Sequence, residues 1–447
     1  MVFASVTFLT FFLPLAIIPC FLIRSTRFQN LYLALVSLLF YAWGEPVYIL
    51  LLLASILVND ILARAIAKGA HKKLLTSMAV VFNIGLLFVF KYGNFCLNLF
   101  NLGEITKIVQ PIGISFYTFQ ILSYVLDVSA GRAEPERSRL NLLLYISFFP
   151  QLIAGPIVTW NEIRPQLNAR RITLHGAAQG LCIFILGLAQ KVLLADSVAP
   201  IADAAFAASL PGLPLAWLGA IAYTLQLYLD FSGYSIMAIG LGRMLGFTFP
   251  ENFRTPLCAW SIQNFWRRWH ITLTGWFRQY LYFPLGGNRK GTFRTYRNLI
   301  IVFLLTGFWH GAAWTFVVWG IWHGVFMLLE RAKLIRPERM PRILAHAYTL
   351  LVVILGFVIF RAESLGHTVS YFAQLFAGEF SVAPFLAQLS PFRICMLILS
   401  ALTAAGIFNR FKMLPEWMLY VVCAILTALC YISLIAQGYH PFLYFRF

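Results

Sequence analysis

Charged residues are scarce in this chain. Only 11% of its 447 residues are Asp, Glu, Lys or Arg, whereas 60% are hydrophobic. Soluble domains usually carry about 25% charged residues. A soluble protein of this length has too little interior to bury so much apolar surface. The composition therefore excludes a soluble globular enzyme and predicts a protein whose main solvent is lipid.

Acidic residues are the scarcest charged class. The chain has 16 Asp and Glu against 34 Lys and Arg, which gives a formal net charge of +18. The cations fall between apolar stretches, as the positive-inside rule requires of a membrane protein. No nucleic-acid-binding motif accompanies them. We therefore expect membrane lipid, and not nucleic acid, as the partner of most of these charges.

Paired cysteines and internal repeats are also lacking. The seven cysteines lie mostly in apolar runs, and none forms a CxxC pair or a metal-ligand spacing. We therefore expect no disulfide framework, no metal site and no bound cofactor. Because we find neither repeats nor a separable soluble region, residues 1–447 are predicted to form one membrane domain.

Long apolar stretches account for the composition. They include residues 1–23, 46–59, 74–90, 204–229 and 417–439. A crossing helix needs about 20 such residues. The first stretch lacks a basic start and a small-residue cleavage site, which predicts a retained span and not a signal peptide. We expect an all-α polytopic protein with eleven or twelve transmembrane helices.

Basic clusters predict which loops face the cytoplasm. The clusters lie near residues 24–27, 64–73, 132–139, 164–171 and 331–342, whereas 195–215 has two Asp and no cation and is expected outside.

An apolar stretch between two of these cytoplasmic clusters poses a problem for simple crossings. Residues 140–157 connect the clusters and are broken by Pro150, Gly155 and Pro156. A re-entrant hairpin fits better than a full crossing. Irregular backbone at membrane depth survives only where it lines a protein cavity. This segment therefore predicts an internal chamber.

Residues 254–297 form a second irregular segment, in which aromatic residues and cations alternate. Apolar side chains recur there at helical spacing, at Phe265, Trp269, Leu273, Trp276 and Tyr280. Arg267, Arg268 and Arg278 interrupt them, and a glycine-rich basic loop follows. The pattern predicts an amphipathic helix that lies at the cytoplasmic interface or re-enters the membrane.

Two histidines are candidates for proton transfer. An ionisable group inside the membrane is a functional hypothesis by default. His310 lies in the apolar block GFWHGAAWTFVVWGIWHG, and His270 lies 40 residues earlier, in the aromatic-basic segment. An imidazole suits general base catalysis because its ordinary pKa is near neutrality. Equally, His310 could be a hydrogen-bonded core residue and His270 an interfacial residue.

Three further features have both a functional and a structural interpretation. The cations of 267–297 could anchor the segment to anionic head groups or bind the phosphates of a cytosolic nucleotide-bearing donor. Asp230 lies within an apolar stretch, where we expect a structural role and a buried partner. His323 repeats the Trp-His-Gly triplet of His310 and has no predicted role.

Six blocks of sequence, in order along the chain, resemble the membrane-bound O-acyltransferase family. The blocks are residues 115–128, 148–157 (FFPQLIAGPI), 230–247, 264–291 (NFWRRWHITLTGWFRQYLYFPLGGNRKG), 307–324 and 441–447 (PFLYFRF). They are most similar to the branch that contains the alginate O-acetylation membrane protein and the D-alanyl-lipoteichoic acid transferase. One departure is Ile236, where many members of the family have Asp.

The resemblance implies a fold and a site. In the family the histidine of the apolar Trp-His-Gly block is essential, which corresponds to His310, and a second polar position corresponds to His270. The family fold is a ring of helices around a tunnel that the acyl donor enters from the cytosol. We expect Arg267, Arg268 and Arg278, together with Trp269 and Trp309, to bind the donor.

The resemblance also implies a function. We expect an acetyltransferase of the bacterial inner membrane that uses cytosolic acetyl-CoA to acetylate an exported polysaccharide, through a periplasmic acetyltransferase-like partner. One alternative keeps the enzyme class and transfers D-alanine from a carrier protein to teichoic acid. Another is a transporter of lipid-linked sugars without acyl chemistry, although the matched repeats of broken helices typical of transporters are missing.

Overall fold

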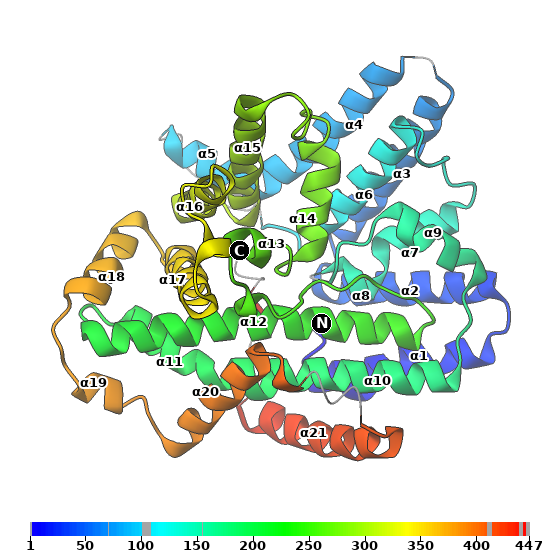
Figure 1. Cartoon of the computed structure of the whole chain (residues 1–447). Helices are drawn as coiled ribbons and strands as arrows, with labels where there is room; N and C mark the ends of the chain where they lie inside the picture. Colours follow the sequence, from blue (N-terminus) through cyan, green and yellow to red (C-terminus); the bar gives the residue numbers. More distant parts are fainter. Residues whose placement is uncertain are drawn as a thin grey trace. The chain divides into compact units, whose positions relative to one another are not determined.

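Every regular element that the structure describes is a helix. The computed structural model describes residues 2–69, 71–100, 109–153, 155–408, 414–437 and 441–443 (Figure 1). The predicted all-α class is confirmed over these ranges. The helices form two compact units, one of residues 1–184 and 234–251 and the other of 185–233 and 252–447. Two long helices, α10 (Leu174–Ala189) and α12 (Gly212–Met244), contribute residues to both units.

The first unit contains two short π-helices, η1 and η2, and nine described α-helices of its own. Their bounds are η1 Phe8–Phe12, α1 Leu13–Leu22, α2 Thr26–Gly44, α3 Ile49–Ala67, α4 Lys72–Leu87, η2 Phe88–Tyr92, α5 Gly93–Leu99, α6 Ile114–Ser129, α7 Arg139–Ser147, α8 Phe149–Leu152 and α9 Trp160–Ala169.

The second unit contains the predicted reaction centre. Its elements are η3 Gln190–Ala195, α11 Asp196–Ala207, η4 Pro256–Cys258, α13 Ile262–Trp266, α14 Ile271–Phe277, η5 Arg278–Tyr282, α15 Thr292–His310, α16 Trp314–Arg331, η6 Pro337–Arg339, α17 Arg342–Arg361, α18 Leu365–Ala377, α19 Ala383–Leu386, α20 Pro391–Ala404 and α21 Glu416–Gln437.

Six of the described helices are long and apolar enough to cross a membrane. They are Ile49–Ala67, Lys72–Leu99, Leu174–Ala207, Gly212–Met244, Arg342–Arg361 and Glu416–Ala436. This supports a multi-pass membrane protein, while the total of eleven or twelve crossings stays a prediction. The predicted stretch 204–229 is wrong as one segment, because α11 ends at Ala207 and α12 begins at Gly212, with Pro211 between them.

The segment predicted to re-enter the membrane is too short to cross it. Helix α7 has nine residues and α8 only four. At about 1.5 Å per residue, α7 is less than half as long as the roughly 30 Å hydrocarbon core is thick. Tyr145, Phe148 and Gln151 are completely buried. The interruption is at Phe148, between α7 and α8, and Pro150 lies within the first turn of α8. The backbone at this interruption is surrounded by protein, as non-helical backbone at membrane depth must be.

The segment predicted as one amphipathic helix is divided in two. Helix α13 ends at Trp266, and α14 begins only at Ile271. The amphipathic pattern itself is confirmed, because the five apolar positions are buried while Arg267 and Arg278 are exposed. The backbone of the break is held by residues that precede α13, since Arg254 N donates to Arg268 O at 2.9 Å and Ile271 N donates to Asn252 O at 2.9 Å. These bonds replace helical ones, so the side-chain pattern survives the interruption.

Helices α15 and α16 form a closely packed pair in the second unit (Figure 1). Glycines make this approach possible. A Cβ atom on Gly307 would lie 2.4 Å from Phe316 O and 3.2 Å from the Cα of Gly320. Any side chain at Gly307 would force the helices apart. Gly307 lies one turn before His310, so this contact fixes the position of that histidine.

Candidate active site

His270 occupies the break between α13 and α14 in a strained conformation. It is the residue immediately before α14 and has φ 44°, in the left-handed region. A non-glycine residue is uncommon there, and such strain clusters at functional sites. Its side chain is 1% exposed, packed edge-on against Phe231 with ring centroids 4.7 Å apart. The fold thus holds this imidazole in one position.

Asn252 determines which nitrogen of His270 carries the proton. Asn252 Oδ1 accepts hydrogen bonds from Thr272 N at 3.3 Å and Thr272 Oγ1 at 2.9 Å, and it lies 3.1 Å from His270 Nδ1. Because a backbone N–H can only donate, this atom of Asn252 must be the carbonyl oxygen. His270 Nδ1 therefore donates, and Nε2 carries the lone pair.

His270 is held neutral with an unused acceptor. It lies outside the six candidate spans, and burial lowers its pKa to about 3. His270 Nε2 is buried and has no hydrogen-bond partner within the part of the chain that the structure describes. A buried polar atom without a partner calls for an explanation. A substrate group that donates a hydrogen bond would supply one.

His310 is the last residue of α15 and is 4% exposed. Aromatic rings surround it. Trp309 lies 5.0 Å away between ring centroids, Trp319 4.9 Å and Phe360 5.3 Å. Trp309 also lies 6.2 Å from His270. The two predicted catalytic histidines are therefore brought together on one shared indole, 40 residues apart in sequence.

His323 belongs to the same aromatic cluster. Its ring centroid lies 5.1 Å from that of Trp319 and 5.3 Å from that of Trp266. It is completely buried. Cavities of about 400 and 670 Å³ are lined by residues of the first unit and not by these histidines. The predicted passage to His310 stays a prediction.

The predicted donor-binding residues separate into two groups. Trp269 and Trp309 are buried, and the ring of Trp309 lies beside both predicted catalytic histidines. Arg267 and Arg278 are exposed, and Arg278 lies over the ring of Phe283, 5.2 Å from its centroid. Arg268 is half-buried and donates to Thr255 Oγ1 at 3.4 Å. The tryptophans are thus buried near the histidines, whereas Arg267 and Arg278 face the surface.

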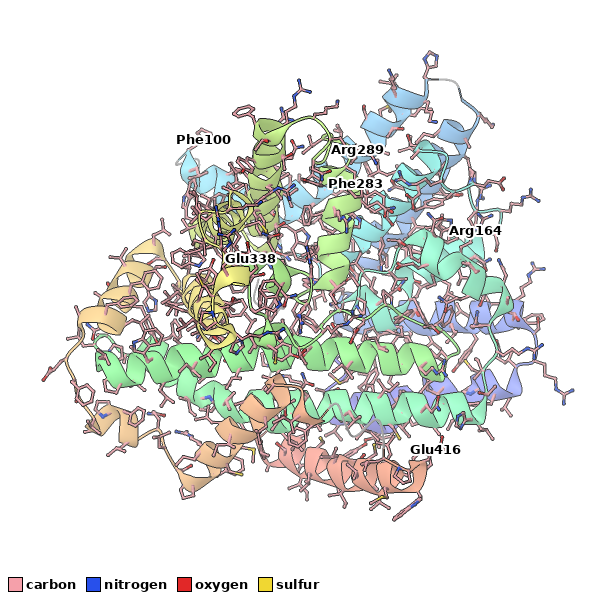
Figure 2. The ribbon with its side chains drawn as sticks, viewed as in Figure 1. Phe100, Arg164, Phe283, Arg289, Glu338 and Glu416 are labelled. Carbon is pink, nitrogen blue, oxygen red and sulfur yellow. The ribbon has the colours of Figure 1, made fainter. Side chains whose placement is uncertain are left out.

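The basic loop lies far from the histidines. Figure 2 shows Phe283 and Arg289 in the loop that precedes α15. His310 is at the other end of this 19-residue helix, which is about 28 Å long at 1.5 Å per residue. The loop could meet the remote end of an extended donor but not its reacting end.

Asp230 has the buried partner that its sequence position predicted. Lys191 Nζ lies 2.8 Å from Asp230 Oδ1 and 2.5 Å from Asp196 Oδ1. Leu443 N donates to Asp230 Oδ2 at 2.9 Å. Phe231, the next residue, packs on His270. The ion pair therefore supports the wall of the histidine cluster.

Several residues of the site were not indicated by the sequence patterns. Lys191 could have been found, because it is a cation within an apolar run. Asn252, Trp319 and Phe360 gave no such signal, since their importance comes from side-chain contacts with the histidines that only the folded chain shows. Ala154 of block 148–157 and residues 444–447 of block 441–447 lie outside the described residues.

The chain is similar to a family model and to several known proteins. The family model of MBOAT, the membrane-bound O-acyltransferase family, matches residues 136–365. The chain is 38% identical to the probable alginate O-acetylase AlgI of Pseudomonas putida, over 100% of both chains. It is 39% identical to the peptidoglycan O-acetyltransferase of Helicobacter pylori, over 82% of this chain and 78% of that one. It is also 25% identical to the teichoic acid D-alanyltransferase of Bacillus subtilis, over 58% and 71%.

The matched range contains both histidines and every predicted donor-binding residue. A relative similar from end to end and a model that matches half of the chain agree with the six blocks in the sequence. The chain therefore belongs to the membrane-bound O-acyltransferase family and is a multi-pass membrane acyltransferase.

Proposed function

We propose that this protein transfers acetyl groups from cytosolic acetyl-CoA to a hydroxyl of an exported polysaccharide, across the bacterial inner membrane. A periplasmic acetyltransferase-like partner would complete the delivery. The relatives named as O-acetylases support the acetyl group and the polysaccharide. The observation that carries the proposal is the pair of buried imidazoles that both lie beside the indole of Trp309. The acyltransferase family favours this chemistry over a transporter of lipid-linked sugars.

His310 acts as the general base in this proposal. It takes the proton of the acceptor hydroxyl while the oxygen attacks the thioester carbonyl carbon. The tetrahedral intermediate then collapses, the carbon–sulfur bond breaks, and the thiolate takes the proton from His310. The ester and the free thiol are the products, and the imidazole returns to its neutral form. Positioned proton transfer of this kind typically contributes 10²–10⁴-fold.

His270 serves to orient a substrate. The sequence left two roles open for it, orienting the thioester or stabilising the oxyanion. A neutral imidazole with its proton on Nδ1 offers only a lone pair at Nε2, so it cannot donate to an oxyanion. We assign Nε2 to accept a hydrogen bond from an amide N–H of the acetyl-CoA arm, because the single proton of the acceptor hydroxyl goes to His310. This bond would orient the thioester toward the hydroxyl oxygen.

The two substrates are on opposite sides of the membrane, and this explains why the site is buried. A coenzyme A thioester is too polar to cross lipid, and the polymer is outside. A protein-lined passage lets the acetyl end meet a hydroxyl that arrives from the other side. The aromatic walls around His310 would exclude water and so prevent hydrolysis of the thioester. The exposed Arg267 and Arg278 would attract the donor's phosphates.

D-alanyl transfer is the second candidate function. The D-alanyltransferase relative supports it at 25% identity over 58% of this chain, against 38% over the whole chain for the alginate O-acetylase relative. The acetyl donor is therefore favoured. Purified protein that consumed labelled D-alanyl carrier protein, and not labelled acetyl-CoA, would reverse this order.

The test uses the two Trp-His-Gly triplets as matched sites. Protein in proteoliposomes receives labelled acetyl-CoA on one side and a polysaccharide acceptor with its periplasmic partner on the other. His310→Ala should abolish transfer, and His323→Ala should retain it, because His310 alone touches the indole shared with His270. Both histidines are buried and precede glycine, so general damage should affect both variants. Normal transfer by His310→Ala would refute the proposal.

A further inference from the structure

A buried arginine in the first unit has no acidic partner in the part of the chain that the structure describes. Arg170 follows the last residue of α9 and is 7% exposed. Its Nη1 donates to Asn30 Oδ1 at 2.5 Å and to Leu167 O at 3.3 Å. The guanidinium carbon lies 4.5 Å from the ring centroid of Phe247. All of these partners are neutral.

One edge of this guanidinium is unused. Nε and Nη2 of Arg170 are buried and have no partner within the described ranges. These two nitrogens are on the same side of the group, where their N–H bonds point in parallel. That is the fork with which arginine binds two oxygens of one carboxylate or phosphate. The contacts with Asn30 and Leu167 leave this fork free.

The charge on Arg170 cannot be removed by deprotonation. Burial lowers its pKa to about 10, and the group remains charged at neutral pH. A buried charge without a partner is costly. Lys191 in the second unit shows the usual solution, since two carboxylates surround it at 2.5 and 2.8 Å. Arg170 has no equivalent acid among the residues that the structure describes, which favours a partner from outside the chain.

A groove at the turn between α1 and α2 suggests the source of this partner. It has a volume of about 400 Å³ and is lined by Ile23, Arg24, Ser25, Phe28, Leu31, Tyr32 and Leu35. Phe28 and Leu35 are largely exposed. Gln29 ties this turn together by donating to Cys20 O and Ile23 O, and the next residue, Asn30, holds Arg170. The apolar groove and the contact to Arg170 thus involve the same turn of α2.

We propose that Arg170 binds the phosphate oxyanion of an anionic phospholipid through its Nε and Nη2, with an acyl chain of that lipid against the groove of α1 and α2. The basic cluster at residues 164–171 predicts that this loop lies at the cytoplasmic face, where anionic head groups concentrate. A soluble phosphate could supply the same oxyanion. The lipid differs by also covering the exposed apolar side chains of the groove.

The experiment measures lipid binding by the full-length protein. Purified protein in mild detergent is supplied with phosphatidylglycerol, phosphatidylcholine or inorganic phosphate, and retained lipid is counted by native mass spectrometry alongside the thermal unfolding midpoint. Phosphatidylglycerol should be retained and raise the midpoint, whereas phosphatidylcholine should not. Arg170→Gln should weaken retention by about tenfold or more, because charge-assisted hydrogen bonds are lost. Arg170→Lys keeps the charge without the fork and should be intermediate.

The control is Arg171→Gln, which removes the exposed neighbouring charge and should bind as the unaltered protein does. Equal retention by Arg170→Gln, or equal loss in Arg171→Gln, would overturn the proposal. A rise in the midpoint with inorganic phosphate alone would support the oxyanion site and overturn the lipid as its occupant. If Arg170→Gln does not fold, two other measurements test the proposal. They are lipid retention by Arg170→Lys and displacement of phosphatidylglycerol by phosphate from the unaltered protein.

Discussion

The ion cluster of Lys191, Asp196 and Asp230 offers a sharp test of the structure. All three side chains are at most 10% exposed, and one ammonium group serves two carboxylates. Lys191→Met leaves both carboxylates buried without a cation. Asp230→Ala leaves Lys191 with Asp196 and removes the acceptor of Leu443 N. The two changes therefore differ in how much charge they leave uncompensated.

The expected magnitudes follow from this difference. Removing one partner of a buried ion pair costs about 3–5 kcal/mol. Asp230→Ala should lower the free energy of unfolding by about 3 kcal/mol, because Asp196 still compensates Lys191. Lys191→Met should lower it by about 5 kcal/mol. Asp230→Asn should cost about 1 kcal/mol less than Asp230→Ala, since an amide oxygen can still accept from Leu443 N.

The assay is equilibrium unfolding of the detergent-solubilised protein, read by tryptophan fluorescence. The control is Asp203→Ala, which breaks the ion pair with Arg361 at 3.0 Å, where Asp203 is 54% exposed. An exposed pair is worth about 1 kcal/mol or less. Two results would refute the reasoning. One is a free energy of unfolding of Lys191→Met within about 1 kcal/mol of that of the unaltered protein, and the other is a loss of stability in Asp203→Ala as large as that in Asp230→Ala.

Three further predictions concern the histidine cluster. His270→Gln, whose amide oxygen can replace the Nε2 lone pair, should retain more acyl transfer than His270→Asn, and the reverse order would show that Nδ1 is the important atom. Gly307→Ala should reduce transfer and stability together, because its Cβ would lie 2.4 Å from Phe316 O; unchanged transfer rates would contradict the close helix contact. Acidification from pH 7 to pH 5 should lower the unfolding midpoint, since the unfolded chain protonates His270 below its ordinary pKa of 6.5 whereas the folded chain holds that pKa near 3. The stability that comes from keeping His270 neutral is thus fully present above pH 6.5 and is lost as the pH falls. His270→Asn should flatten this pH dependence of the unfolding midpoint.

Particular residues show why some predictions succeeded and others failed. Asp230 could be assigned a buried partner because a carboxylate in an apolar stretch is too costly alone, and Lys191 satisfies it. The helical spacing from Phe265 to Tyr280 correctly identified the buried face. It could not reveal the break at His270, because side-chain periodicity does not record the backbone bonds from Asn252 and Arg254 that hold the break.

The sequence by itself determined the solvent of this protein, its all-helical class and its family, because these follow from composition and from motifs that are local in the chain. It also identified His270 and His310 as the candidates for chemistry. Only the tertiary structure decided that Trp309 lies beside both of them, that Asn252 places the proton of His270 on Nδ1, and that Arg170 is buried without an acid among the described residues. These are properties of contacts between segments tens to more than a hundred residues apart, and packing, not local pattern, determines them.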